Sequence, residues 1–202
     1  TGITGFKGSW LAEVLDFFEA DIYGFALAPK HAEDHFNYLS FKDRTKYGDI
    51  RDDKALKDWV YEVKPEIVFH LAAQPLVRES YRNPTYTYHT NVIGTLNLYE
   101  ACRTAGSVNC LISITTDKVY HNNEWNWPYR ENDQLGGYDP YSSSKACVEI
   151  MTASYRSSYQ QSLFALSTTR AGNVIGGGDW SEDRIVPDMI RSVINQKPLV
   201  IR

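Results

Sequence analysis

Cysteine is scarce in this sequence, with Cys102, Cys110 and Cys147 the three among 202 residues. None of them has the close spacing to another cysteine or histidine that metal ligands or redox pairs show. An odd number of such thiols is typical of reduced cysteines in a cytoplasmic protein. The five histidines are equally scattered and lack the paired spacing of zinc ligands, so we predict no metal site.

Long hydrophobic runs are also lacking. No apolar stretch approaches the roughly 18 residues that a membrane-spanning helix needs, so the sequence predicts no role in a membrane. The net charge of -4 argues against nucleic acid as a partner. The composition is that of an ordinary globular protein, in a chain long enough for one sizeable core.

The start of the sequence carries three evenly spaced glycines, Gly2, Gly5 and Gly8, ahead of an amphipathic stretch that begins at Ser9. Glycines with this spacing permit a tight turn, let the backbone approach a pyrophosphate and allow a helix to pack closely on a sheet. The helix that follows would direct its N-terminus at the anion. A simple glycine turn that caps a helix explains the same spacing. Lys7 is either a phosphate contact or an exposed lysine.

Both ends of the sequence look like interrupted elements. A glycine turn of this kind normally follows a buried strand, and we expect that first strand to be missing. Residues 198–202 are apolar enough for a strand, with no cap or polar tail after them. We therefore expect a fragment of a longer protein, with part of the core and of the ligand pocket outside the sequence.

The second expected strand, residues 21–27, has no acidic residue at its end. The usual dinucleotide-binding pattern places a carboxylate there to hold the ribose hydroxyls. The pattern is therefore incomplete, and it leaves open whether the dinucleotide carries an extra phosphate. Lys30 and His31 lie nearby and are compatible with one. Residues 29–46 form a polar connection to which we assign no structure.

Strand-like and helix-like segments alternate through the rest of the sequence. The expected strands are residues 47–50, 67–73, 110–115 and 164–170, and the expected helices are residues 52–63, 86–105, 141–158 and 185–196. Residues 67–73 form a continuous apolar run, which is typical of a parallel strand buried on both faces. This alternation predicts an α/β fold with a doubly wound parallel sheet.

Two polar residues in these elements are candidates for ligand contact. Asp49 lies at the end of the strand 47–50, where a carboxylate holds an adenine amino group or merely caps a turn. Asn91 lies inside the helix 86–105. It is either tolerated there or hydrogen-bonds a backbone group or a water at the site.

Tyr141 and Lys145 are four residues apart on an expected helix, so both side chains lie on one face. A cation beside a phenol favours the phenolate and brings proton abstraction toward neutral pH. The same spacing also occurs by chance on solvated helix faces. Thr116, Asp117 and Lys118 follow the strand 110–115, at the carboxyl edge where open α/β sheets bind ligands.

Four motifs occur in order: the glycine turn, the strand ending at Ala72 and Ala73, the strand ending at Thr116, and the pair Tyr141 and Lys145. Together they resemble the extended short-chain dehydrogenase/reductase family over essentially the whole chain. The resemblance implies a Rossmann-type domain over residues 1–170, the beginning of a substrate-binding domain over residues 171–202, and NAD as cofactor. The cofactor-binding residues that it implies are Gly2, Gly5, Phe6, Lys7, Gly8, Asp49, Ile50, Leu71, Ala72, Ala73, Asn91, Tyr141 and Lys145.

Further stretches resemble one group within that family, the nucleotide-sugar 4,6-dehydratases that act on CDP-glucose. These stretches are residues 4–10, 70–78, 129–132, 136–141 and 170–180. This resemblance implies oxidation of the sugar at C4, loss of water across C5 and C6, and return of the hydride to C6.

The resemblance also implies a role for each catalytic residue. Tyr141 would be the base on the C4 hydroxyl, Lys145 would lower the pKa of that tyrosine, and Thr116 would hydrogen-bond the same oxygen. Asp117 would protonate the departing C6 hydroxyl. Lys118 stands where related dehydratases carry a glutamate base, so it is either a neutral base for the C5 proton or a positive charge that stabilises the enolate, with the base elsewhere.

Substrate contacts and rival functions complete the expectations. Asn173 and Arg184 would contact the substrate diphosphate, or would belong to a surface turn.

A 4-epimerase of the same family would need Thr116, Tyr141 and Lys145 but neither Asp117 nor Lys118. A sensor that only binds the dinucleotide typically loses the tyrosine or the lysine. By analogy, the helices 86–105 and 141–158 would pair subunits in a homodimer or homotetramer.

Overall fold

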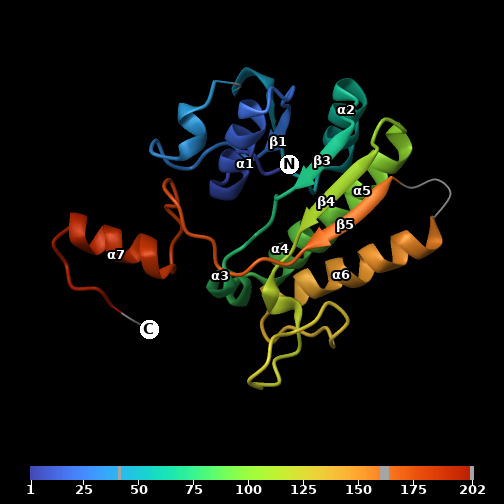
Figure 1. The fold of residues 1–202 in the computed structure, drawn as a ribbon. Helices are drawn as coiled ribbons and strands as arrows, with labels where there is room; N and C mark the ends of the chain where they lie inside the picture. The colour runs from blue at the N-terminus through green and yellow to red at the C-terminus, as the bar shows by residue number, and fades with distance from the viewer. Residues whose placement is uncertain (41, 160–163, 201–202) are drawn as a thin grey trace.

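A computed structural model describes residues 1–40, 42–159 and 164–200 of the chain. Helices and strands alternate along it, with the strands between the helices (Figure 1). In chain order the elements are α1 (Phe6–Phe17), β1 (Gly24–Ala26), η1 (His35–Tyr38), η2 (Lys42–Arg44), β2 (Thr45–Tyr47), α2 (Asp53–Val63), β3 (Ile67–His70), α3 (Val77–Arg82), α4 (Pro84–Tyr88), η3 (His89–Ile93), α5 (Gly94–Ala105), β4 (Cys110–Ile114), η4 (Asp117–Val119), α6 (Pro140–Ser158), β5 (Ala165–Thr169) and α7 (Ile185–Ile194).

The five strands found among the described residues pair in parallel, β1 with β2 in one sheet and β3–β4–β5 in another. Thr1 and Gly2 lie between the two sheets. The Thr1 amine donates to Phe69 O (2.7 Å), and Gly2 N donates to Phe25 O (2.9 Å). Leu71 N donates in turn to Thr1 O (3.1 Å). These bonds join the edge of β1 to the edge of β3.

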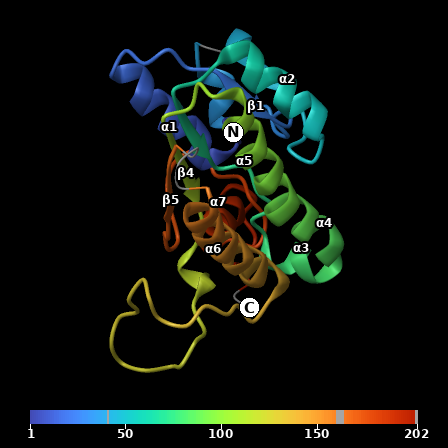
Figure 2. The same ribbon diagram turned by 90° about the vertical axis from the view of Figure 1, so that its right-hand side faces the viewer.

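Helices cover both faces of the strands (Figure 2). Phe25 and Ala26 are neighbours in β1 and therefore point to opposite faces. Phe25 packs in a core with Leu98 of α5 and Leu111 of β4. Ala26 packs in a second core with Ala12 of α1. This arrangement confirms the predicted doubly wound α/β fold.

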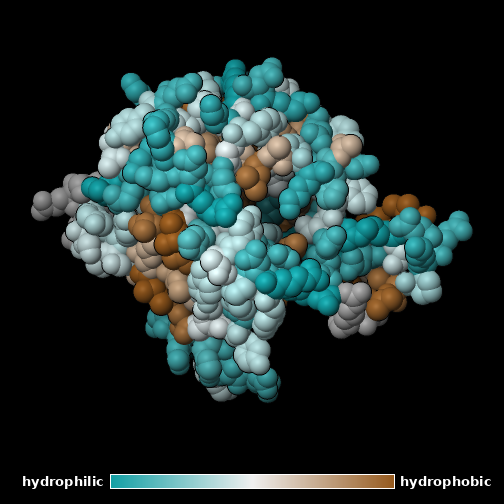
Figure 3. All heavy atoms as spheres, turned by 180° about the vertical axis from the view of Figure 1, so that it is seen from behind, coloured by the Kyte–Doolittle hydropathy of each residue, from teal (hydrophilic) through white to brown (hydrophobic). Residues whose placement is uncertain are grey.

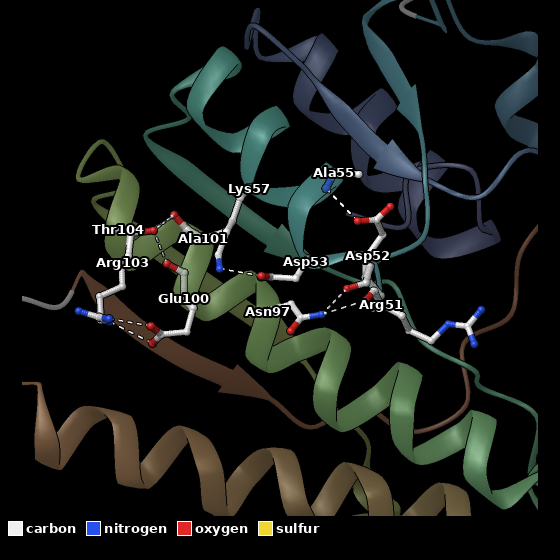
Figure 4. Close-up of polar contacts among 11 residues, drawn as sticks. Arg51, Asp52, Asp53, Ala55, Lys57, Asn97, Glu100, Ala101, Arg103 and Thr104 are labelled. Atoms are coloured by element: carbon white, nitrogen blue, oxygen red, sulfur yellow. Dashed lines mark hydrogen bonds and ion pairs between the residues drawn. The ribbon is translucent and has the colours of Figure 1, made fainter.

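Helices α2 and α5 pack together on one face, and polar contacts fix the entry into α2 (Figure 4). Asp52 caps α2 by accepting a hydrogen bond from Ala55 N (3.0 Å). From α5, Asn97 Nδ2 donates to Ile50 O (3.0 Å). Gly94 of α5 lets the two segments approach, because a Cβ there would lie 2.6 Å from Ile50 Cδ1.

The strand expected at residues 47–50 is wrong in its position, because β2 is Thr45–Tyr47. Asp52 N donates to Asp49 O, so Asp49 already belongs to the turn that leads into α2. The hydrophobic pattern missed β2 because its three residues are not buried. The connection 29–46, which we left unassigned, contains two short 3₁₀ helices and most of this strand.

The first helix begins earlier than the expected Ser9. Gly5 is its N-cap, and α1 starts at Phe6. The Ser9 amide donates to Gly5 O (2.9 Å), which closes the first turn. Lys7 therefore lies on the helix itself rather than in a loop before it.

The long helix expected over residues 86–105 is interrupted. It consists of α4, a π-helical turn over His89–Ile93 and α5. A π-helical turn inside an α-helix shifts the faces that follow it and is frequent at functional sites. Asn91 lies in this turn.

Three further strand predictions need correction. Residues 67–73 were expected to form a strand buried on both faces, but β3 ends at His70 and its first residue, Ile67, is 59% exposed. Similarly, β1 spans only the centre of the expected strand 21–27. Of the strand expected at 198–202, the described residues 198–200 have no regular structure, and 201–202 lie outside the described residues.

Hydrophobic side chains are exposed along α7, which extends to the right in the view from behind (Figure 3). Ile185, Val193 and Ile194 are among them. Within the described ranges, no helix is both long and apolar enough to span a membrane. Nor do the described residues contain a group of three His, Cys, Asp or Glu side chains that could hold a metal ion.

Candidate active site

Helix α6 presents the Tyr141 and Lys145 pair. Asp139 caps the helix by accepting from Ser142 N (2.9 Å) and Ser142 Oγ (2.6 Å), and Pro140 occupies the first turn. This cap fixes the direction in which the helix leaves the end of the preceding loop. Tyr141 therefore lies in the first turn of α6, and Lys145 lies one turn further along the same face.

Lys145 is buried beneath the carboxyl edge of the sheet. Its side-chain Nζ donates to Ile114 O at the end of β4 (2.9 Å), and the residue is 4% exposed. Burial lowers the pKa of Lys145 from 10.5 to about 7. The positive charge of Lys7 lowers this pKa further, whereas the charge of Glu149 raises it.

Tyr141 has a raised pKa in this structure because it is largely desolvated. A hydrogen bond with Thr116 and the positive charge of Arg184 act against that rise. The sequence assigned this lowering of the pKa of Tyr141 to Lys145. In the structure, the pKa of Tyr141 is raised, the cation that opposes this rise is Arg184, and the Lys145 ammonium donates to Ile114 O.

The triplet after β4 forms the 3₁₀ turn η4. Thr116 is its N-cap and donates from Oγ1 to Asp117 Oδ1 (3.0 Å). Asp117 N donates to Ala171 O (3.1 Å), which ties the triplet to the chain that leaves β5. Thr116 is buried, whereas Asp117 and Lys118 are exposed.

A cavity of about 400 Å³ brings many of the predicted residues together. The predicted site residues that line it are Lys7, Thr116, Lys118, Tyr141, Asn173 and Arg184. Three of these side chains belong to lysine or arginine, and Asp179, Glu182 and Asp183 also line the cavity, so its charge is mixed. Among the described residues, neither Asp117 nor Lys145 lines this cavity, although Asp117 adjoins two residues that do and Lys145 lies one turn from Tyr141.

Asn173 and Arg184 belong to the segment that follows β5. Arg184 is half-buried and pairs with Asp179 (3.0 Å), whose side chain is 5% exposed. Asn173 is exposed at the cavity. The larger hollow between α3 and α7, about 860 Å³, shares Arg78 with this cavity, so the two adjoin.

The glycine turn is pressed against the end of β3. Gly2 has φ +75°, and a Cβ there would lie 2.5 Å from Ala72 N. A Cβ at Gly8 would lie 2.1 Å from Gly2 O, so glycine at both positions is required by space. Gly5, the N-cap of α1, meets no atom closer than 3.4 Å. The turn thus brings the N-terminus of α1 beside Ala72, as a cradle for an anion requires.

The neighbours of the cradle include other predicted cofactor residues. Phe6 packs against Gly176, where a Cβ would lie 2.9 Å from the Phe6 ring. Lys7 is half-buried, and both burial and the charge of Arg184 lower its pKa. Leu71 and Ala73 flank Ala72 and are half-buried after β3.

The side chains of Asp49 and Ile50 already contact other residues of the protein. The carboxylate of Asp49 accepts from Arg51 Nη2 (2.6 Å) and Arg51 N, and these bonds lower its pKa against the effect of burial. Ile50 is 4% exposed and belongs to the core beside α5. The capping alternative that the sequence left open for Asp49 describes these contacts, and any adenine contact would share its carboxylate with Arg51.

Asn91 is fully buried and hydrogen-bonded. Its Oδ1 accepts from Gln74 N (2.8 Å), and its Nδ2 donates to Gln74 O (3.1 Å) and to Ser144 Oγ (2.8 Å). Asn91 therefore joins the loop after β3 to α6 next to Lys145. Of the two alternatives that the sequence left open, these contacts match the one in which Asn91 hydrogen-bonds a backbone group, and its predicted cofactor contact stays a prediction.

Sequence reasoning missed Gln74 and Glu149, two buried side chains behind the site. Gln74 adds a bond from Nε2 to Thr87 Oγ1 (2.9 Å). Glu149 accepts three side-chain hydrogen bonds, from the residue just beyond β4, from β5 and from the residue just beyond β5. Neither belongs to a local motif, although the position of Glu149 one turn after Lys145 on the same face was a signal in the sequence.

Comparisons with known proteins show the family to which the chain belongs. The family described as GDP-mannose 4,6 dehydratase matches residues 1–199. The CDP-glucose 4,6-dehydratase of Salmonella typhimurium is 48% identical over 100% of this chain and 58% of its own length. The chain therefore spans little more than half of that relative.

Solved structures show the same fold. The UDP-glucose 4-epimerase of Thermus thermophilus, in complex with NAD, superposes with a TM-score of 0.85 over 98% of this chain and 62% of its own, at 27% identity. The dTDP-glucose 4,6-dehydratase of Bacillus anthracis, also in complex with NAD, gives a TM-score of 0.79 over 98% and 61%, at 26% identity.

Proposed function

The chain belongs to the GDP-mannose 4,6 dehydratase family, and on this basis we propose that it is the dinucleotide-binding and catalytic part of a CDP-glucose 4,6-dehydratase. The observation that carries the proposal is the cavity shared by Thr116, Lys118 and Tyr141. An epimerase would need the threonine and the tyrosine but not the lysine. The similarity to the Salmonella typhimurium enzyme supports CDP-glucose as the substrate.

NAD is the proposed cofactor, and the cradle at Gly2, Gly5 and Gly8 fits its pyrophosphate because a Cβ at Gly2 or Gly8 would clash with backbone. When bound, NAD supplies hydride transfer, taking hydride from C4 of the sugar and returning it at C6. The amides at the start of α1 and the half-buried Lys7 would hold the pyrophosphate. The two NAD complexes with this fold support the assignment.

The oxidation at C4 needs a base and a hydrogen-bond donor at the same oxygen. In the proposed mechanism, Tyr141 takes the C4 hydroxyl proton and Thr116 hydrogen-bonds the developing carbonyl oxygen. Arg184 favours the phenolate of Tyr141. Because the pKa of Lys145 is about 7, both of its protonation states are populated at neutral pH, and it can relay a proton behind the tyrosine.

The elimination of water needs a proton donor at C6 and charge stabilisation at the enolate. We assign the first to Asp117, which is held by Thr116 and Ala171 at the edge of the site. Lys118 is exposed, so the described residues do not supply the desolvation that a neutral lysine base requires. Its position at the cavity favours the positive charge that stabilises the enolate, and in that role the proton that leaves C5 passes to a base other than Lys118.

The product of the reaction tests the proposal directly. Purified full-length protein, incubated with CDP-glucose and NAD, is expected to release a 4-keto-6-deoxy sugar nucleotide that has lost one water by mass spectrometry. The same assay with UDP-glucose and GDP-mannose measures the preference for the cytidine nucleotide. A product of unchanged mass would identify an epimerase, and no turnover of any nucleotide sugar would refute the proposed activity.

Replacing Asp117 with asparagine is expected to lower the rate of water elimination roughly 100-fold, because general acid catalysis contributes on the order of 10²–10⁴. Oxidation at C4 would continue, since Thr116 and Tyr141 are retained. Transient reduction of NAD, followed by absorbance in a single turnover, is therefore expected to persist in the variant while the dehydrated product forms slowly.

The matched control is Asp43→Asn, which alters an exposed aspartate of η2. It is expected to leave both half-reactions unchanged. Wild-type product formation in Asp117→Asn would show that another group protonates the leaving hydroxyl. Oligomeric assembly into a homodimer or homotetramer stays a prediction from the resemblance.

A further inference from the structure

Glu149 is a buried carboxylate that the proposed mechanism does not use. It is 5% exposed and lies on α6 one turn after Lys145, and thus on the same face as Tyr141 and Lys145. A carboxylate is rarely buried to this extent unless it is paired or hydrogen-bonded, because the loss of hydration is costly. The hydrogen bonds of this carboxylate therefore indicate which elements of the fold it holds together.

The carboxylate of Glu149 joins α6 to the ends of two strands. Its Oε1 accepts from Thr115 Oγ1 (2.5 Å), next to the catalytic Thr116. Its Oε2 accepts from Thr168 Oγ1 (2.9 Å) at the end of β5 and from Arg170 Nη2 (2.9 Å) just beyond it. The same side chain thus fixes the strand end that carries Thr116 against the helix that carries Tyr141.

The Arg170 and Glu149 pair is enclosed, with side chains 16% and 4% exposed. The Arg170 guanidinium also donates to Glu131 O (2.9 Å) and lies 4.8 Å from the ring centre of Tyr120. Burial opposes ionisation of Glu149, but the bonds from Arg170 and the threonines outweigh it, and the pKa of Glu149 is lowered. A buried ion pair of this kind often stabilises a fold no more than apolar packing would. Stability alone therefore does not explain why a charged pair lies behind the catalytic residues.

The titratable groups that face Lys145 come from three elements. Lys7 of α1 lowers the pKa of Lys145, and Glu149 of α6 raises it. His70 of β3 also faces Lys145, but burial holds the pKa of this histidine well below 6.5, so its imidazole is neutral. Glu149 thus supplies the negative charge that offsets the burial of the Lys145 ammonium.

We propose that Glu149 is a positioning residue for the proposed dehydratase reaction: its carboxylate locks the ends of β4 and β5 to α6, so that Thr116 stays beside Tyr141, and places a fixed negative charge one turn behind Lys145. This inference rests on the proposed function, since it assigns to Glu149 a role in the oxidation at C4. It also implies that the Glu149 carboxylate keeps the pKa of Lys145 higher than it would otherwise be, which can be measured without any turnover.

The experiment compares Glu149→Gln with Glu149→Asp in the full-length protein. Glutamine keeps the shape but removes the charge, and kcat is expected to fall roughly 10- to 100-fold, because a small misplacement of catalytic groups costs on the order of 10²-fold. The alkaline limb of the pH profile is expected to move down by about one unit, because Lys145 loses its proton more readily without the neighbouring anion. Aspartate keeps the charge, so the limb is expected to stay nearer to the wild-type position.

The matched control is Glu100→Gln. Glu100 of α5 also pairs with an arginine, Arg103 (2.6 Å; Figure 4), and accepts from a hydroxyl, that of Tyr155 (2.8 Å), but it does not line the cavity. Its variant is expected to retain the wild-type kcat and pH profile. Equal profiles for the variants at positions 149 and 100, or a fall in kcat with an unmoved alkaline limb, would overturn the proposal.

A second measurement does not depend on activity. The pH titration of the Lys145 side-chain ¹⁵N resonance in the protein without nucleotide, assigned with a Lys145→Arg variant, is expected to shift to lower pH in Glu149→Gln. An unchanged Lys145 pKa in Glu149→Gln overturns the proposal. If that variant does not fold, Glu149→Asp decides: it keeps the charge but shortens the link to the strand ends, so kcat is expected to fall while the Lys145 pKa stays near its wild-type value, and a wild-type kcat overturns the proposal. If the wild-type protein lacks dehydratase activity while the titration shifts, the proposed function fails and the coupling between Glu149 and Lys145 stands.

Discussion

Replacing Tyr141 with phenylalanine is expected to lower the kcat of the dehydratase reaction roughly 1,000-fold, within the range of 10²–10⁴ that a positioned general base contributes. The substitution removes only the hydroxyl, so the ring keeps its place in the first turn of α6. Binding of NAD, measured by calorimetry, is expected to change little, because the cradle at Gly2 and Gly8 is untouched. The loss would therefore appear in kcat rather than in affinity for the dinucleotide.

The control for this substitution is Tyr138→Phe. Tyr138 lies close to Tyr141 in the sequence but is 99% exposed, so loss of its hydroxyl is expected to leave turnover unaltered. Unchanged turnover in Tyr141→Phe would refute the assignment of the base. A comparable loss in both variants would point to a general effect on the loop before α6.

Replacing Lys145 with methionine is expected to change both catalysis and the pH dependence of stability. Turnover should fall on the order of 100-fold, because the proton relay behind Tyr141 is lost. The effect on stability follows from the pKa of Lys145, which burial lowers from 10.5 to about 7 in the folded protein. Methionine has a similar length and carries no charge to desolvate.

The sign of the stability effect is determined by which state binds more protons. Between pH of about 7 and 10.5, the unfolded chain keeps the Lys145 proton and the folded protein has released it. The free energy of unfolding therefore gains a contribution that rises with pH through this window, by about 1.4 kcal/mol per pH unit for one proton. Below the window both states are protonated, and the full cost of the buried charge remains.

Urea unfolding at a series of pH values between 7 and 10 measures this difference. The free energy of unfolding of the wild-type protein minus that of Lys145→Met is expected to rise with pH. The control is Lys54→Met on α2, where the lysine side chain is 86% exposed and the corresponding difference should not rise in this way. A pH-independent difference for Lys145→Met would show that the lysine keeps its proton in the folded protein.

The architecture was predictable because its signals are local. The alternation of apolar strands with amphipathic helices indicated a parallel α/β sheet, and β4, α2 and α6 lie where their patterns place them. β2 was misplaced because Thr45–Tyr47 is short and partly exposed, so it shows no apolar run. The π-helical turn at His89–Ile93 was missed because a helix with one wider turn has nearly the same periodicity as a regular one.

The positions of the site residues were likewise predictable from local sequence, whereas the charges that surround them were not. Spacing alone placed Tyr141 and Lys145 on one face, and the order of the motifs placed Thr116 at the adjacent strand end, because helix period and sheet polarity are properties of the local chain. The charges around these residues are not local. Arg184, which opposes the rise in the pKa of Tyr141, and Lys7, which adds to the lowering of the pKa of Lys145, approach from distant parts of the sequence.

The chain thus encodes locally which groups can react and on which face of α6 they stand. Their protonation depends instead on burial and on charges that meet only when the glycine turn, α6 and the segment after β5 pack together. Burial moves the pKa of Lys145 by several units, more than any neighbour in the sequence can, and no periodicity reports it. For this reason the pair was visible in the sequence, whereas the ionisation of its members was settled by tertiary packing.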